Sequence, residues 1–480
     1  MTKEIRVRSA PSNSGADIHV GNCRTILFNH LFARKNGGTT IFRIEDSDIA
    51  RCKPEYADNI ASTLDWLGLR ADEGYKIGGD RGPYCQTQKL DRYKQVADEL
   101  IERGFAYRCY CTQDELNNLR NALPENTRHT FRYPGICRDR KDWPNNKDYV
   151  VRLKASTEGF VEWNDLVFQK MVVPNKENFD WVLMRSNGIP LYNFGCAVDD
   201  HDQAITHVCR GRDHIINMGP QIILHELLNS QHIEYCHLPM MLGADKTKLS
   251  KRHGSVSITE YRNAGYSPGG ILNYLCRFGW GYKNQEIFSM EDLIDKFSFD
   301  GCGRNDGCFD VKKFAAIQYE HLKREDLTPN EEYAYRTLPF LSARGIENLN
   351  TDQLISLIPL IRTRCKTFIE AANELDPIIR KDITIDEAAI NKFVTDRSKS
   401  ILNNLYTYLS TVETISAWNE QYLCYTTHRW LETSNLTLKD IGQTLRIALT
   451  GRSSSPELFA VMGALGKDVV LNRINNLLTR

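Results

Sequence analysis

Residues 5–44, IRVRSAPSNSGADIHVGNCRTILFNHLFARKNGGTTIFRI, determine the fold class of this chain. They predict a strand at 5–8, a Pro/Ser/Asn/Gly loop at 11–15, a helix from about 22 to 35 and a strand at 39–44. The pair Leu27 and Leu31 gives this helix its i, i+4 spacing. A second helix is bracketed by Pro54 at its start and Gly68 past its end. Strand, loop, helix, strand and helix in this order are typical of an α/β fold with a doubly wound parallel sheet.

The composition indicates a globular protein of several domains. The chain has 480 residues, with 41% hydrophobic and 25% charged residues. No apolar run approaches the roughly 18 residues that a membrane span requires, and the first residues show no signal or transit segment. We therefore expect a cytoplasmic protein without a membrane partner. The formal net charge of zero leaves an RNA partner open, because local basic patches can hold RNA.

Two later regions differ in character from the start of the chain. From about 89 to 191 the sequence is more polar and carries three clustered cysteines, so we interpret it as an insertion in the sheet domain. A strand–helix pattern resumes near Tyr192. After residue 350 the chain has only four glycines, and Leu354, Leu357, Ile358 and Ile361 lie at helical spacing. The last part of the chain is therefore predicted to be helical.

Two short motifs indicate a nucleotide site. His19-Val20-Gly21-Asn22 lies at a predicted helix start, where unpaired N–H groups and the helix dipole favour phosphate. Gly21 would let a nucleotide approach the backbone. Lys248-Leu249-Ser250-Lys251-Arg252 offers ammonium groups that suit a leaving pyrophosphate. Taken alone, the first motif is better explained as a loop histidine before a helix-capping Asn22, and most strings like the second are solvated basic turns.

Further segments stand with these motifs in one order. They are Arg8-Ser9-Ala10-Pro11-Ser12, Arg43-Ile44-Glu45-Asp46-Ser47-Asp48, Trp66-Leu67-Gly68-Leu69, Gly82-Pro83-Tyr84, Tyr192-Asn193-Phe194, Val198-Asp199-Asp200-His201 and Thr206-His207-Val208-Cys209-Arg210-Gly211. The whole set closely resembles the glutamyl-tRNA synthetases, bacterial type, of the class I family with HIGH and KMSKR signatures. The resemblance covers essentially the whole chain.

The resemblance implies a ligase that uses ATP with Mg²⁺. Such an enzyme activates glutamate to glutamyl-adenylate, releases pyrophosphate and transfers glutamate to the 3′-terminal adenosine of tRNA-Glu. The residues it implies as catalytic are His19, Lys248 and Lys251. Those implied for ATP also include Gly21, Asp213 and Ser250. Those implied for glutamate are Arg8, Ala10, Ser12, Glu45, Tyr192, Cys196 and Arg210, of which the arginines would hold the side-chain carboxylate.

The resemblance also implies a domain order and a monomer. We expect a Rossmann-type catalytic domain at 1–88 and 192–242 with an inserted acceptor-binding domain at 89–191. A mixed stem-contact domain with the KLSKR loop would follow at 243–328. Two all-α anticodon-binding domains would occupy 329–380 and 381–480. An arginine in the segment 362–367 is associated in the family with rejecting tRNA-Gln; Arg364 is our candidate, with Arg362 as the alternative.

Three of the 14 cysteines form a candidate metal site. Cys109, Cys111 and Cys137 fall within the predicted insertion, and some relatives hold structural Zn²⁺ there. Zinc takes four ligands, mainly thiolate or imidazole, with oxygen also acceptable. For the fourth ligand we predict Asp139, with Tyr133 second. The alternative is three free thiols, because Cys-x-Cys is less diagnostic than Cys-x-x-Cys.

Departures from the family pattern keep other functions open. The loop before His19 is one residue longer than usual and lacks a proline, which is expected to loosen it. Arg212 stands where relatives commonly have Glu. A diverged paralogue that charges tRNA-Gln and a catalytically weak RNA-binding relative are the alternatives. A nicotinamide- or pantetheine-type adenylyltransferase would share the histidine loop but would leave the helical C-terminal third unexplained.

Overall fold

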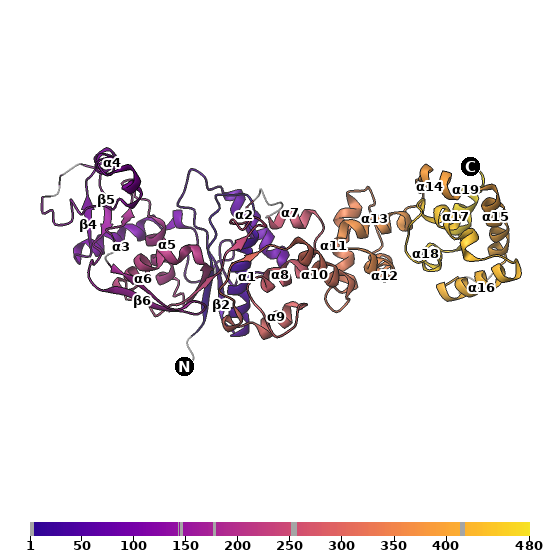
Figure 1. Cartoon of the computed structure of the whole chain (residues 1–480), viewed down its shortest axis with the longest axis horizontal. Helices are drawn as coiled ribbons and strands as arrows, with labels where there is room; N and C mark the ends of the chain where they lie inside the picture. The colour runs from indigo at the N-terminus through magenta and orange to yellow at the C-terminus, as the bar shows by residue number, and fades with distance from the viewer. Residues whose placement is uncertain (1–3, 143, 145–146, 176–178, 251–256, 413–417) are drawn as a thin grey trace. The chain divides into compact units, whose positions relative to one another are not determined.

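The computed structural model describes residues 4–142, 144, 147–175, 179–250, 257–412 and 418–480. The chain divides into two compact units (Figure 1). The first comprises Met1–Glu260 and Leu272–Val311, and the second comprises Tyr261–Ile271 and Lys312–Arg480. The described strands all belong to the first unit, and the second unit is helical. The predicted α/β fold with a helical C-terminal part is confirmed.

The strands of the first unit form one large sheet and two small ones. In chain order they are β1 (Arg6–Ser9), β2 (Thr39–Phe42), β3 (Glu73–Gly74), β4 (Ala106–Cys109), β5 (Val150–Leu153), β6 (Phe160–Asp165), β7 (Gln169–Pro174), β8 (Val182–Met184), β9 (His207–Gly211), β10 (Glu234–Leu238), β11 (Met241–Leu242) and β12 (Gly307–Cys308). The large sheet has the order β3-β2-β1-β9-β10-β6-β7. All its neighbours are parallel except β6 and β7.

The chain reverses its direction of winding between β1 and β9. After β1 it passes through α1 (Val20–Lys35) to β2 on one side, whereas β9 pairs on the other side. In register, Arg8 pairs with Ile41 of β2, and Val7 pairs with His207 of β9. Ligands of open α/β sheets bind beyond the carboxyl ends of the strands at such a switch point. The topology therefore places a ligand site beside the residues that follow β1 and β9.

The first helices follow the signals in the sequence. α1 begins at Val20, two residues before the predicted start, because His19 serves as its N-cap. α2 (Pro54–Leu67) has Pro54 in its first turn and ends at Gly68, which adopts the left-handed conformation with φ of 77°. Both limits of α2 agree with the prediction.

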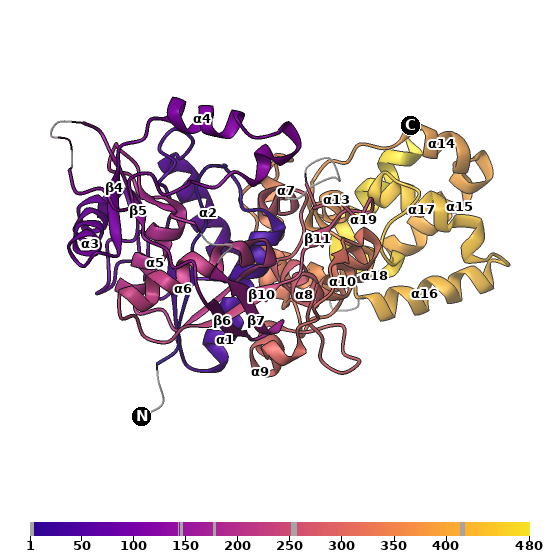
Figure 2. The ribbon, with the colours of Figure 1, turned by 60° about the vertical axis from the view of Figure 1, so that its left-hand side comes forward.

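The predicted insertion is only partly separate from the large sheet. β4, β5 and β8 form an antiparallel sheet of their own, beside α3 (Leu90–Glu102) and α4 (Gln113–Asn121). β6 and β7 instead continue the large sheet next to β10 (Figure 2). The segment 89–191 therefore contributes two strands to the large sheet. Local sequence patterns do not reveal this, because the pairing of β6 with β10 is long-range.

The remaining helices cover the sheet and build the second unit. They are α5 (Tyr192–Asp202), α6 (Met218–Leu227), α7 (Ile258–Asn263), α8 (Pro268–Arg277), α9 (Met290–Lys296), α10 (Val311–Lys323), α11 (Asn330–Ser342), α12 (Thr351–Ile361), α13 (Phe368–Ile379), α14 (Glu387–Phe393), α15 (Asp396–Ser410), α16 (Glu420–Thr433), α17 (Leu438–Thr450), α18 (Leu458–Leu465) and α19 (Lys467–Leu478). α5 and α6 lie side by side next to β6 (Figure 1).

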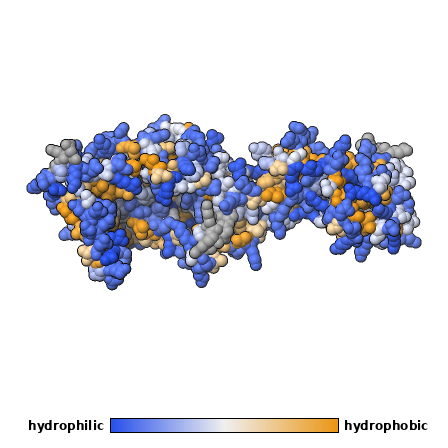
Figure 3. All heavy atoms as spheres, turned by 90° about the horizontal axis from the view of Figure 1, so that it is seen from above, coloured by the Kyte–Doolittle hydropathy of each residue, from blue (hydrophilic) through white to orange (hydrophobic). Residues whose placement is uncertain are grey.

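The second unit has two hydrophobic cores. One is built mainly from residues 322–378, and the other from residues 385–477. Hydrophilic residues predominate on the face shown in Figure 3, where hydrophobic side chains gather in separate patches. Within the described residues, no helix combines the length and the apolar character that a membrane crossing needs.

Candidate active site

A cavity of about 320 Å³ opens at the carboxyl ends of β1 and β9, at the switch point of the sheet. Its size suits a small-molecule ligand. Of the residues predicted to bind glutamate, those that line it are Arg8, Ala10, Ser12, Glu45, Tyr192 and Arg210. Cys196 does not line the cavity but lies behind Arg8, with its Sγ 3.7 Å from Nη2. The structure thus brings most of the predicted set together around one space.

Arg8 is held in the cavity wall by a buried carboxylate. Its Nε lies 3.4 Å from Oδ1 of Asp200, and the same oxygen accepts a 2.7 Å hydrogen bond from Nη1 of Arg43. Burial would raise the pKa of the Asp200 carboxyl, but Arg8 and Arg43 hold that pKa below its ordinary value. Asp200 therefore stays ionised and fixes two guanidinium groups beneath the cavity.

Glu45 supplies a carboxylate to the same cavity. Its Oε1 accepts a 3.2 Å hydrogen bond from Nη2 of Arg43. Burial raises the pKa of Glu45, and Arg43 and Arg8 only partly oppose this shift. An ammonium group of a ligand placed beside Glu45 would therefore stabilise the ionised form of this carboxylate. Neither Arg43 nor Asp200 was assigned a role from the sequence, because local patterns do not show which charges become buried together.

Arg210, the last residue but one of β9, also lines the cavity. Its Nη1 donates to Oε1 of Gln221 at 2.8 Å, and its Nη2 lies 2.9 Å from Sδ of Met218. Its Nε donates to Nε2 of His237 at 3.2 Å. Tyr192, at the start of α5, places its hydroxyl 3.1 Å from Nδ1 of His214, which also lines the cavity.

His19, which was predicted to bind the nucleotide, precedes α1 and does not line the cavity. Its Nδ1 accepts a 3.1 Å hydrogen bond from the backbone N–H of Gly21, so the imidazole caps α1. Burial lowers the pKa of His19, and the charge of Lys248 lowers it further. The neutral ring then carries its proton on Nε2, where it can donate to a phosphate oxygen. A Cβ at Gly21 would lie 3.3 Å from Nδ1 of His19, so the glycine leaves room for this ring.

The second motif approaches the first within the same unit. Nζ of Lys248 forms a 2.9 Å ion pair with Oδ2 of Asp213, and both side chains are partly exposed. Ser250 follows two residues later and is half-buried. Beyond the motif, the N–H of Ile258 bonds to the carbonyl of Ile18, directly before His19. Lys251 lies outside the described residues.

Local contacts compensate for two of the departures from the family pattern. The longer loop is anchored by Asn13, which is buried and donates from Nδ2 to the carbonyl of Lys53 at 2.9 Å. This bond opposes the expected loosening. Arg212 forms a 3.1 Å ion pair with Asp306, so its charge is matched by a carboxylate.

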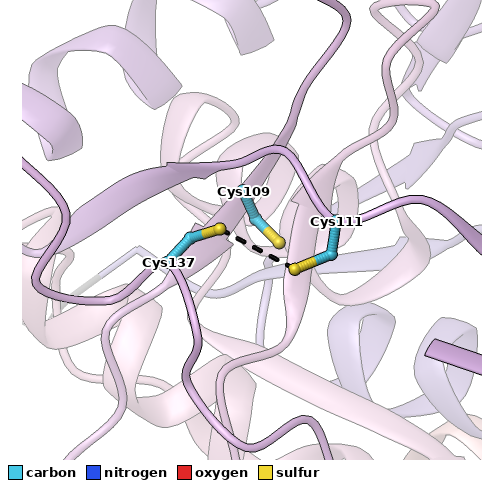
Figure 4. Close-up of side chains that lie close together, drawn as sticks. All are labelled: Cys109, Cys111 and Cys137. Carbon is cyan, nitrogen blue, oxygen red and sulfur yellow. Dashed lines mark hydrogen bonds between the residues drawn. The ribbon is translucent and has the colours of Figure 1, made fainter. Parts of the chain in front are cut away.

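The three cysteines converge as predicted from their clustering (Figure 4). The sulfur atoms of Cys109, Cys111 and Cys137 lie within 4.8 Å of one another, and those of Cys111 and Cys137 are 3.7 Å apart. The predicted fourth ligand, Asp139, points elsewhere: it is exposed and forms a 3.0 Å ion pair with Lys154. Spacing placed Asp139 near the thiols, but its lysine partner and solvent hold it outside the cluster.

Tyr133, the second candidate, occupies the position that Asp139 does not. Its hydroxyl lies 3.4 Å from Sγ of Cys109 and accepts a 2.8 Å hydrogen bond from the backbone N–H of Cys137. The guanidinium of Arg152 stacks 3.9 Å from the centre of its ring. Burial, and then the neighbouring Cys109, raise the pKa of Cys111 to about 12. A divalent cation would offset this by stabilising the thiolates.

In the helical unit, the two candidate arginines for the anticodon differ in exposure. Arg364 is partly exposed, with its Nε 3.3 Å from Oε2 of Glu374 and its Nη2 3.1 Å from Oγ of Ser454. Arg362 is buried, donates to the carbonyl of Thr328 and lies over the ring of Tyr333. Of the two, Arg364 is the one that a large partner can reach.

Two family models match the chain in the order of its units. The catalytic domain of the class I tRNA synthetases (E and Q) matches residues 4–315, and an anticodon binding domain matches residues 332–478. A glutamate–tRNA ligase of Anaeromyxobacter sp. (strain Fw109-5) is 40% identical over 473 residues, which cover 98% of each chain. This chain belongs to the glutamate–tRNA ligase family.

Other members of the glutamate–tRNA ligase family match over similar lengths. That of Myxococcus xanthus (strain DK1622) is 36% identical over 486 residues, covering 100% of both chains. The crystal structure of a glutamate tRNA ligase from Elizabethkingia meningosepticum CCUG26117 in complex with its amino acid is similar, with a TM-score of 0.82. It is 26% identical and covers 99% of each chain. The family likeness therefore includes the helical unit.

Proposed function

We propose that this protein is a glutamate–tRNA ligase that acts on tRNA-Glu. The α-carboxylate of glutamate attacks the α-phosphate of MgATP and displaces pyrophosphate, which gives glutamyl-adenylate. A hydroxyl of the 3′-terminal adenosine of the tRNA then attacks the activated carbonyl carbon, and AMP leaves. The observation that carries the proposal is the joint presence of Arg8, Arg210 and Glu45 around one cavity at the switch point. In a member of this family, that set matches the charges of glutamate.

Two charges of glutamate, that of the side-chain carboxylate and that of the α-ammonium, have a counterpart in the cavity. The guanidinium groups of Arg8 and Arg210 suit the side-chain carboxylate, because arginine binds carboxylates through paired N–H donors. The carboxylate of Glu45 suits the α-ammonium. Glutamine would place an amide before two cations and lose a charge-assisted interaction at each.

The nucleotide side positions phosphates and stabilises charge. His19 donates from Nε2 to a phosphate oxygen at the start of α1, where the helix dipole adds to the attraction. Lys248 and Lys251 neutralise charge on the departing pyrophosphate, and Gly21 and Ser250 complete the ATP site. Asp213 holds Lys248 in place until the phosphates arrive. The reaction thus depends on orientation and electrostatics and requires no protein nucleophile.

Aminoacylation of purified tRNA-Glu and tRNA-Gln with labelled glutamate tests this function. We expect charging of tRNA-Glu with glutamate and none with glutamine. Charging of tRNA-Gln at a comparable rate would instead establish the wider tRNA specificity. If the wild type discriminates against tRNA-Gln, Arg364→Ala should raise the charging of tRNA-Gln relative to tRNA-Glu, whereas Arg362→Ala should mainly reduce stability. A protein that binds tRNA but gives neither charging nor pyrophosphate exchange would overturn the proposal.

We further propose that Cys109, Cys111, Cys137 and Tyr133 hold a structural Zn²⁺. Three sulfur atoms and one phenolic oxygen provide the tetrahedral donor number that zinc prefers. The buried surroundings and the Arg152 stack fix these donors before the metal binds. Zinc would stabilise the small sheet of β4, β5 and β8, since Cys109 ends β4.

Metal analysis tests the zinc site. We expect close to one equivalent of zinc in the wild type, less than about a tenth in Cys137→Ser, and a retained but more easily chelated metal in Tyr133→Phe. Asp139→Asn is the matched control and should keep the metal. Zinc-free wild-type protein would show that the three thiols are free.

A further inference from the structure

Behind Arg210 lies a buried chain of hydrogen bonds that the proposed reaction does not use directly. Nε of Arg210 donates to Nε2 of His237 at 3.2 Å, and Nδ1 of His237 lies 2.6 Å from Oδ2 of Asp165. Arg210 and His237 are paired neighbours on β9 and β10, and Asp165 ends β6. The side chains of His237 and Asp165 are 0% and 1% exposed. Three adjacent strands thus meet in one polar relay below the cavity.

The hydrogen bonds fix where each proton lies. Arginine can only donate, so Nε2 of His237 must accept from Arg210. The proton of the neutral imidazole then lies on Nδ1 and is donated to the carboxylate of Asp165. A protonated imidazole would turn an N–H towards the N–H of Arg210, which is a repulsive contact. Oδ1 of Asp165 accepts the backbone N–H groups of Val167 and Phe168, at 3.0 and 2.9 Å, so the carboxylate is itself held in place.

With these bonds in place, two N–H groups of the Arg210 guanidinium remain available to a ligand. Nε is engaged by His237, one N–H of Nη1 by Gln221 and one N–H of Nη2 by Met218. A further N–H remains on each terminal nitrogen. These donors suit the two oxygens of one carboxylate. Because a long side chain loses this arrangement when its Nε partner is removed, the relay determines how Arg210 meets its ligand.

We propose that Asp165 and His237 are positioning residues for the amino acid substrate. They do not touch glutamate; Asp165 sets the tautomer of His237, and His237 orients the guanidinium of Arg210 towards the side-chain carboxylate. This inference rests on the proposed function, in which Arg210 binds that carboxylate. It also gives β6 a role in the active site, although this strand falls in the segment predicted to be an insertion.

Three substitutions distinguish an effect on the orientation of Arg210 from a loss of buried packing. In Asp165→Asn, Oδ1 can keep the two backbone bonds while the amide donates to Nδ1 of His237; the imidazole proton then moves to Nε2 and opposes Arg210. His237→Asn can still donate to Asp165 but no longer reaches Arg210. His237→Gln places an amide oxygen where Nε2 was and restores an acceptor for Arg210.

We expect weaker glutamate binding in the variants that lose the acceptor for Nε of Arg210, and near-normal binding in the variant that keeps it. In pyrophosphate exchange, Asp165→Asn and His237→Asn should raise the KM for glutamate about 10- to 30-fold, the scale of an arginine side chain released from one rotamer. The kcat and the KM for ATP should change less than about threefold. His237→Gln should return the KM to within about threefold of the wild type. His225→Gln, a buried histidine bonded to Ser230, is the matched control and should leave the KM unchanged.

Arg210→Met distinguishes the failure of this inference from that of the proposed function. If Arg210→Met leaves the KM for glutamate unchanged, the role of Arg210 itself is wrong. If Arg210→Met raises the KM but Asp165→Asn and His237→Asn do not, only the relay is wrong. Equal KM changes in His237→Gln and His237→Asn would likewise overturn it. Thermal unfolding of each variant shows that it is folded, and Asp165→Asn, which keeps the shape of the side chain, carries the test if His237→Asn fails to fold.

Discussion

Replacing Arg8 with methionine removes one of the two arginines that line the cavity while keeping the bulk of the side chain. In the free protein, Arg8 is 3.4 Å from Asp200, whereas Arg43 binds the same oxygen at 2.7 Å. Asp200 therefore keeps its stronger partner in Arg8→Met. The main loss should fall on the bound glutamate, whose carboxylate would meet a methionine in the wall of the cavity.

The size of this loss follows from burial. The side chain of Arg8 is only 6% exposed, so water cannot replace it. Truncating one member of a buried, hydrogen-bonded charge pair costs about 2–5 kcal/mol. At about 3 kcal/mol the KM for glutamate would rise about 100-fold, since about 1.4 kcal/mol corresponds to a factor of ten. The KM for ATP should change little, because Arg8 lies on the amino acid side.

The assay is glutamate-dependent pyrophosphate exchange in the presence of tRNA, with glutamate varied over at least three decades. Arg6→Met is the matched control: Arg6 lies on the same strand and is equally buried, but it pairs with Glu73 at 2.9 Å and does not line the cavity. It should lower stability without changing the KM for glutamate. A folded Arg8→Met protein with the KM of the wild type would refute the assignment of the cavity.

Two further predictions concern charge. Asp200→Asn removes the charge that the buried guanidinium groups of Arg8 and Arg43 share and leaves Arg43 with Glu45 and Asp199. It should reduce the free energy of unfolding at pH 7 by about 3 kcal/mol in urea titrations. The pKa of Asp200 is lowered in the folded state from 3.8, so the ionised carboxylate stabilises the fold above about pH 4, and this stabilisation is lost as the pH falls further. The difference in unfolding free energy between the variant and the wild type should therefore shrink in acid. A difference that stays constant with pH would contradict this. Lys248→Ala should lower kcat for pyrophosphate exchange about 100-fold or more and change the KM for glutamate less than about threefold. A pure KM effect would assign Lys248 to substrate binding instead.

The parts of the fold that local patterns encode were predictable. The stretch 5–44 gave strand, helix and strand in the right order, and Pro54 and Gly68 marked α2 correctly. The start of α1 was misplaced by two residues because the imidazole of His19 acts as the cap, a role that the residue type alone does not indicate. β6 and β7 were assigned to the insertion because their place in the large sheet depends on a pairing with β10, far along the chain.

In the candidate site, too, some residues could be predicted from local motifs and others could not. Residues that line the cavity, such as Arg8 and Glu45, are carried by motifs and could be predicted to lie together. Residues that act through them could not: Asp200 and His237 are ordinary charged and polar residues until the fold buries them against a partner. Asp139 shows the opposite error, because its spacing suggested a metal ligand, whereas Lys154 binds it at the surface.

The most direct test is the amino acid dependence of pyrophosphate exchange, measured with tRNA-Glu present. With tRNA-Glu and MgATP present, we expect exchange with glutamate and less than about a hundredth of that rate with glutamine or aspartate. Two buried guanidinium groups favour a carboxylate over an amide, and those of Arg8 and Arg210 line the same cavity. Exchange supported equally by glutamine, or no exchange with any amino acid, would contradict the claim that this cavity activates glutamate.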